Sequence, residues 1–87
     1  MNELEDLRKE IDRINIELAR LIERRLKVVD EIFQFKSNKG LDVYNPVREQ
    51  EMFNKITKEF EDSLFQKEII HFLKIIVEYS KLRKIKI

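Results

Sequence analysis

Residues 1–36 contain neither Pro nor Gly and carry one continuous apolar pattern. Its members recur at alternating steps of three and four, which places them along one face of a helix. This N-terminal seam consists of Leu4, Leu7, Ile11, Ile14, Leu18, Leu21, Val28, Ile32 and Phe35. A helix over residues 3–36 would run roughly 50 Å at ~1.5 Å per residue, which is too long for one small domain to cover. The pattern therefore predicts a long helix whose seam is covered by a second copy of the chain.

A cation interrupts this seam. Arg25 stands where the spacing asks for an apolar residue, and an unpaired cation in a core would cost several kcal/mol. Lys36 follows 11 residues later, so at ~100° per residue it faces nearly the same way, ~16 Å further along the helix. The two long side chains could therefore hold a small anion between them.

Arg8 lies too far from Arg25 along one helix, roughly 25 Å, to reach the same small ligand. If two copies cross antiparallel near residue 19, however, Arg8 lies opposite about residue 30 of the partner chain, between Arg25 and Lys36. A two-fold dimer would then build two identical sites, each completed by Arg8 from the other chain. The alternative is that Arg8 and Lys36 are ordinary surface charges flanking a coiled coil.

The composition narrows the class of protein. The chain of 87 residues is short enough to form one domain, 1–87. A core of this size is marginally stable and the chain has no cysteine for disulfides, so oligomerisation is the common way left to stabilise it. A net charge of only +1 disfavours nucleic acid as a partner. No apolar run approaches ~20 residues, and the acidic start is unlike a signal peptide, so we expect no membrane association and a cytoplasmic location. His71 is isolated, and no metal or cofactor is expected.

Turn residues divide the chain into three helices. Gly40, the single glycine, suits the position just past the end of the first helix. Asn45 is a favoured N-cap residue and Pro46 a favoured first helical residue, so we expect a second helix to begin there. Ser63 and Gln66 have the spacing of a capping box at the start of a third helix. The predicted fold class is all-α, with one long N-terminal helix and two shorter ones.

Taken in order, these features resemble the all-α, AroQ-type chorismate mutases over nearly the whole chain. The resemblance rests on Leu7-Arg8 with Ile11-Asp12, Leu21-Ile22-Glu23-Arg24-Arg25, Lys36, Asn45-Pro46-Val47-Arg48-Glu49, and Ile75-Ile76 before Ser80. It implies an intertwined homodimer forming a six-helix bundle with two shared active sites. It also implies the Claisen rearrangement of chorismate to prephenate without a cofactor, in the shikimate pathway to phenylalanine and tyrosine.

The resemblance also implies roles for individual residues. The partner chain's Arg8 and Arg25 would hold substrate carboxylates, and Lys36 would donate to the ether oxygen as its bond to carbon breaks. Arg48 would support the carboxylate-binding charges. Glu49 would accept from the ring hydroxyl, helped by the backbone of Asn45.

Near the end of the chain, Ser80 would contact the ring carboxylate and Lys84 would donate a second hydrogen bond to the ether oxygen. Two positions depart from the family pattern: Asn45 stands where Asp is common, and Lys84 where Gln or a protonated Glu is usual. Two other interpretations stay open. One is an isochorismate-pyruvate lyase on the same fold; the other is a non-catalytic helical dimer or regulatory module, which Lys84 favours.

Overall fold

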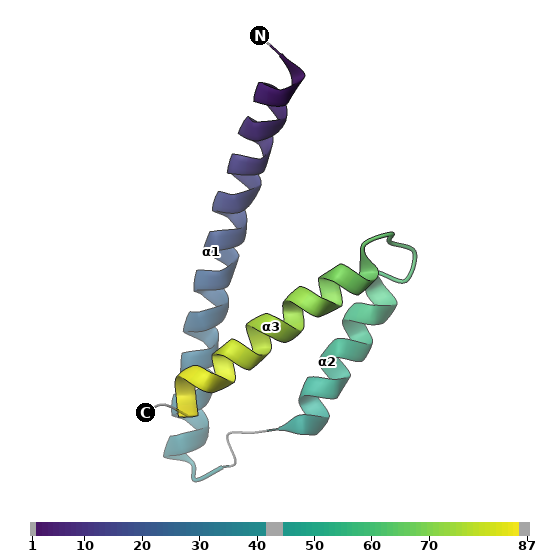
Figure 1. The fold of residues 1–87 in the computed structure, drawn as a ribbon. Helices are drawn as coiled ribbons and strands as arrows, with labels where there is room; N and C mark the ends of the chain where they lie inside the picture. Colours follow the sequence, from purple (N-terminus) through teal and green to yellow (C-terminus); the bar gives the residue numbers. More distant parts are fainter. Residues whose placement is uncertain (1, 42–44, 86–87) are drawn as a thin grey trace. The chain divides into compact units, whose positions relative to one another are not determined.

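All regular secondary structure in the described part of the chain is α-helical. The computed structural model describes residues 2–41 and 45–85, with side chains as far as residue 83. That part contains α1 (Glu3–Asn38), α2 (Pro46–Glu59) and α3 (Gln66–Ile85) and no strand (Figure 1). The predicted all-α fold with one long and two shorter helices is confirmed. The chain forms two compact units, Met1–Lys39 and Gly40–Ile87, which are described separately below.

Both ends of α1 follow from local chemistry. The side chain of Asn2 accepts a hydrogen bond of 2.7 Å from the backbone N–H of Glu5. Acidic residues in the first turn, Glu3, Glu5 and Asp6, suit the positive end of the helix dipole. The helix continues two residues beyond the predicted end at 36. It stops before Gly40, whose φ of +68° is the left-handed conformation that glycine adopts most readily.

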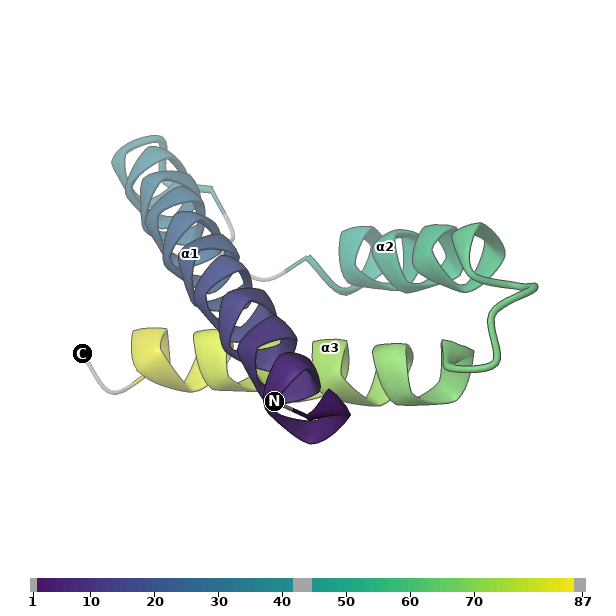
Figure 2. The ribbon, with the colours of Figure 1, turned by 90° about the horizontal axis from the view of Figure 1, so that it is seen from above.

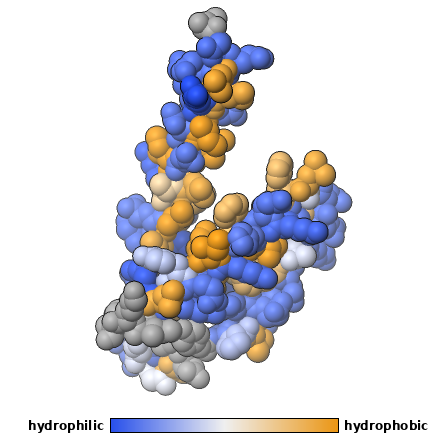
Figure 3. Space-filling view, viewed as in Figure 1, coloured by the Kyte–Doolittle hydropathy of each residue, from blue (hydrophilic) through white to orange (hydrophobic). Residues whose placement is uncertain are grey.

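The N-terminal seam is exposed along the whole of α1. Each of its nine residues keeps at least 48% of its surface accessible, and α1 contains no buried residue. Apolar side chains recur along the upper part of this helix in the view of Figure 3. A contiguous apolar surface of this extent is typical of an interface rather than of a free helix.

The second unit begins with the predicted cap. Asn45 precedes α2, its side-chain oxygen accepts from the backbone N–H of Arg48 at 3.1 Å, and Pro46 is the first helical residue. Asn and Asp serve almost equally well as N-caps, so the departure from the family pattern at this position preserves the helix start.

The start of α3 differs from the capping box that the sequence predicts. Ser63 does accept a hydrogen bond, from the backbone N–H of Phe65 at 3.0 Å. The side-chain amide of Gln66, however, donates to the carbonyl oxygen of Thr57 at 2.7 Å, in the last turn of α2. The prediction was wrong because a carbonyl at the end of the preceding helix lies within reach of Gln66. The side chain therefore ties the two helices together.

Within this unit, α3 runs back alongside α2 (Figure 2). Half-buried apolar residues occur on both helices, and Val77 and Ser80 on α3 are the buried ones among the described residues. A second apolar face of α3 stays exposed; it comprises Phe72, Ile75, Tyr79 and Leu82. In the described residues, no helix is both long and apolar enough to span a membrane.

Gly40 offers a test of how α1 ends. Replacing it with Ala should lower the free energy of unfolding by about 1 kcal/mol, because a Cβ disfavours the left-handed conformation. Apart from Gly40 and its two chain neighbours, no heavy atom lies within 4 Å of the position that a Cβ would occupy there, so the loss should come from the backbone conformation. Gly40→Asn should lose less, since Asn tolerates this conformation better. Urea unfolding at one fixed protein concentration measures both; equal stability of the parent and Gly40→Ala would contradict the left-handed helix end.

Candidate active site

Two of the candidate cations on α1 lie on a half-buried face. Arg25 and Lys36 are each half-buried, whereas residues 2–24 are exposed. The half-buried residues of α1 share one face of its C-terminal part; they are Arg25, Leu26, Val29, Asp30, Phe33 and Lys36. The last three members of the seam remain exposed beside this face. The structure thus places Arg25 and Lys36 on one face of one helix.

Arg8 has a different environment. Its guanidinium forms an ion pair of 3.2 Å with Glu5 one turn earlier, and the two side chains are 62% and 56% exposed. An exposed pair of this kind contributes little to stability and can open easily. Arg8 is therefore accessible to a ligand or a partner chain.

Three candidates come together at the start of α2. Asn45 caps the helix and is exposed, and the side chain of Arg48 is also exposed. Glu49 is half-buried, and its carboxylate contacts the ammonium of Lys81 on α3, with Nζ 2.9 Å from one oxygen and 2.8 Å from the other. The first turn of α2 is thereby joined to the C-terminal part of α3.

Two neighbouring residues on α3 complete this region. Ser80 is buried, and its hydroxyl donates to the carbonyl oxygen of Ile76 at 2.9 Å. Lys81 also pairs with Glu78 at 3.2 Å. The hydrogen bond to Glu49 raises the pKa of Lys81 above its ordinary value of 10.5, against the opposing effect of burial, and Glu78 adds to the rise. Lys81 is therefore a cation throughout the physiological range.

The residues predicted to form the site occur in both units of the chain. Arg8, Arg25 and Lys36 belong to the first, and Asn45, Arg48, Glu49 and Ser80 to the second. Lys84 falls within α3, but its side chain lies outside the described residues.

Lys81 was missed by sequence analysis. It stands 32 residues from Glu49, in a run of basic residues that suggests only a solvated helix end. No local spacing connects these two positions.

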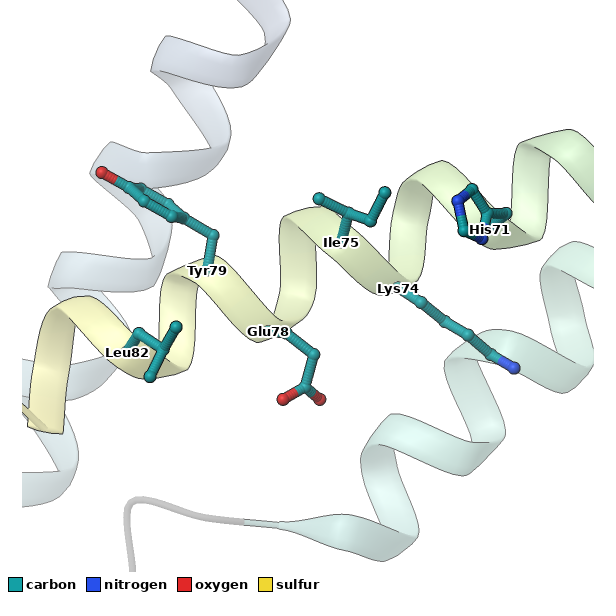
Figure 4. Close-up of a pocket in the computed structure, with 6 residues that line it drawn as sticks. All are labelled: His71, Lys74, Ile75, Glu78, Tyr79 and Leu82. Carbon is teal, nitrogen blue, oxygen red and sulfur yellow. The ribbon is translucent and has the colours of Figure 1, made fainter.

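A separate pocket lies along α3. Its lining residues, His71, Lys74, Ile75, Glu78, Tyr79 and Leu82, all project from this helix (Figure 4). None of them is a predicted site residue. The described residues contain no group of His, Cys, Asp and Glu arranged to hold a metal ion.

The candidate groups suit an anionic ligand. Half-buried cations on α1 can attract carboxylates, because a partly desolvated charge interacts more strongly than one in water. The carboxylate of Glu49 can accept a hydrogen bond from a ligand hydroxyl.

Comparison with known proteins identifies the family. Residues 7–84 match chorismate mutase type II. The chain is 40% identical over 93 residues to the bifunctional chorismate mutase/prephenate dehydratase of Aquifex aeolicus, an alignment that covers the whole chain but 26% of that relative. It is 26% identical to the chorismate mutase of Methanocaldococcus jannaschii, over 93% of this chain and 83% of that one.

The fold agrees with this assignment. A solved structure of chorismate mutase from Thermus thermophilus superposes with a TM-score of 0.84 at 35% identity, covering 91% of this chain and 99% of that one. The chain spans about a quarter of the length of the Aquifex relative. It belongs to the chorismate mutase type II family.

Proposed function

We propose that this chain, as a single domain of residues 1–87, is a chorismate mutase that converts chorismate to prephenate on the route to phenylalanine and tyrosine. The observation that carries the proposal is the family match over residues 7–84, which spans every candidate site residue from Arg8 to Lys84. The solved structure of a chorismate mutase that matches along 99% of its length supports it further.

The chemistry explains why cations dominate the candidate set. In this rearrangement one carbon–oxygen bond breaks while one carbon–carbon bond forms within the same molecule. The enzyme therefore has to hold a dianion in its compact reactive shape and stabilise the charge that develops on the ether oxygen. Arg25 and the partner chain's Arg8 hold the carboxylates in this scheme. Lys36 donates to the ether oxygen.

The second unit supplies the remaining contacts. Glu49 accepts from the ring hydroxyl together with the backbone of Asn45, and Arg48 supports the carboxylate-binding charges. Ser80 contacts the ring carboxylate, and Lys84 donates the second hydrogen bond to the ether oxygen. No cofactor takes part.

The exposed N-terminal seam supports a homodimer that forms a six-helix bundle. Covering one large aliphatic or aromatic side chain contributes about 1.5–3 kcal/mol, and the nine residues of the seam are at least 48% exposed. A second copy can cover them with the same nine side chains, since a two-fold interface is self-complementary. The dimer also brings Arg8 of each chain to the site of the other.

The primary experiment adds chorismate to the full chain, follows the loss of its absorbance and identifies the product. Prephenate supports the proposal. A parallel assay uses isochorismate as the substrate. Release of pyruvate from isochorismate, with no turnover of chorismate, would favour the lyase, and no turnover of either substrate would favour a non-catalytic module.

The two lysines proposed to face the ether oxygen should behave differently. Lys36→Ala should lower turnover about 10²–10³-fold, as loss of an oxyanion donor does elsewhere. Lys84→Gln should keep or raise activity, because an amide still donates a hydrogen bond. Its advantage over the parent should grow with pH, since an ammonium can lose its proton and an amide cannot. pH–rate profiles of both variants measure this; a silent Lys36→Ala with an inactive Lys84→Gln would reverse the assignment.

A mixing experiment tests whether the sites are shared between chains. Arg8→Ala and Lys36→Ala should each be inactive alone. After mixing and refolding, a heterodimer has one site that lacks both side chains and one intact site. With random pairing, about a quarter of the parent's sites should be intact. Activity that stays at the level of the single variants, although mass spectrometry detects heterodimers, would contradict shared sites.

A further inference from the structure

The ion pair between Glu49 and Lys81 has the geometry of a positioning contact. Lys81 Nζ lies 2.9 and 2.8 Å from the two oxygens of one carboxylate, and the side chains of Lys81 and Glu49 are 27% and 29% exposed. By comparison, Lys27 and Glu23 are 3.9 Å apart within one helix, with side chains 71% and 68% exposed. The Glu49 pair is therefore closer and better shielded from water.

We propose that Lys81 is a positioning residue that holds the Glu49 carboxylate in place to accept the ring hydroxyl of the substrate. This inference rests on the proposed function. A glutamate has a flexible side chain, and contact at both of its oxygens restricts the orientation of the carboxylate. The hydroxyl then meets an acceptor that is already oriented.

The ion pair does not use up the hydrogen-bonding capacity of the Glu49 carboxylate. An ionised carboxylate offers about four lone-pair sites, so an ammonium that occupies one on each oxygen leaves others available. Lys81 is itself held by Glu78 at 3.2 Å, one turn earlier on α3. The orientation of Glu49 is thereby coupled to α3, the helix that also carries Ser80.

Two other roles for Lys81 make different predictions. It could join α2 to α3 without influencing the reaction, or it could contact the substrate directly. If Lys81 were only a structural link, its replacement would lower stability, and any effect of the replacement on turnover would not depend on the carboxylate of Glu49. A direct contact would remain effective after the carboxylate of Glu49 is removed.

The test uses the full chain and Lys81→Met, which keeps most of the apolar stem and removes the ammonium. We expect kcat/KM for chorismate to fall about tenfold, less than for loss of a group that touches the reacting atoms. Lys81→Arg should recover part of the loss. The matched control, Lys27→Met, makes the same change in the exposed pair with Glu23 and should stay within about twofold of the parent.

A double-mutant cycle with Glu49→Gln gives the deciding readout. If Lys81 acts through Glu49, Lys81→Met should have almost no further effect in the Glu49→Gln background. A full effect of about tenfold there, or parental kcat/KM in Lys81→Met alone, would overturn the positioning role. An inactive parent would instead overturn the proposed function, and the positioning role with it.

Circular dichroism and thermal unfolding at matched concentration check that each variant is folded. If Lys81→Met does not fold, Lys81→Arg replaces it in the double-mutant cycle. The larger guanidinium would shift the Glu49 carboxylate while keeping the ion pair. Its effect should likewise disappear beside Glu49→Gln, and persistence of the effect would overturn the role.

Discussion

The apolar seam of α1 is the constraint on which the rest of the structure depends. The seam extends from Leu4 to Phe35 along a helix of 36 residues, and every member remains about half exposed or more. Helix propensity alone stabilises such an element weakly, because most helical stability in proteins comes from packing of an apolar face. In the proposed homodimer, packing of this seam against the seam of a second copy would supply the free energy that stabilises α1.

Polar residues at the helix ends determine where each element starts and stops. Two asparagines, Asn2 and Asn45, cap α1 and α2 with the same side-chain-to-backbone hydrogen bond. The single glycine and the single proline both lie at helix boundaries, at Gly40 and Pro46. The interiors of the helices therefore contain neither glycine nor proline, the two residues that weaken a helix most. This arrangement allows a chain with few turn residues to form three separate helices.

The charged residues divide into two groups with different physical roles. Arg25 and Lys36 are half-buried on one face of α1, where each can attract a carboxylate more strongly than in water. Glu49 and Lys81 neutralise each other between α2 and α3. In the proposed mechanism, Glu49 can therefore serve as an acceptor without adding negative charge near an anionic substrate. The proposed mechanism thus assigns attraction of the dianion and orientation of its hydroxyl to different helices. The proposed rearrangement depends on substrate conformation, so it would require both.

Sequence alone determined the features that depend on near neighbours in the chain. The three helices, the Asn45–Pro46 start, the glycine after α1 and the common face of Arg25 and Lys36 all follow from spacings of a few residues or from helical periodicity. The family was recognisable because its motifs stand in order along the chain. The roles of Arg8, Arg25, Lys36, Asn45, Arg48, Glu49, Ser80 and Lys84 remain proposals drawn from that resemblance.

Only the tertiary structure decided which residues meet across large separations. Gln66 bonds to Thr57 instead of completing a capping box, and Lys81 reaches Glu49 from 32 residues away. The structure also decided that Val77 and Ser80 on α3 are buried while Phe72 and Tyr79 are exposed. Local periodicity places residues on a face of a helix, but the packing of one helix against another determines which face is covered and which charges pair.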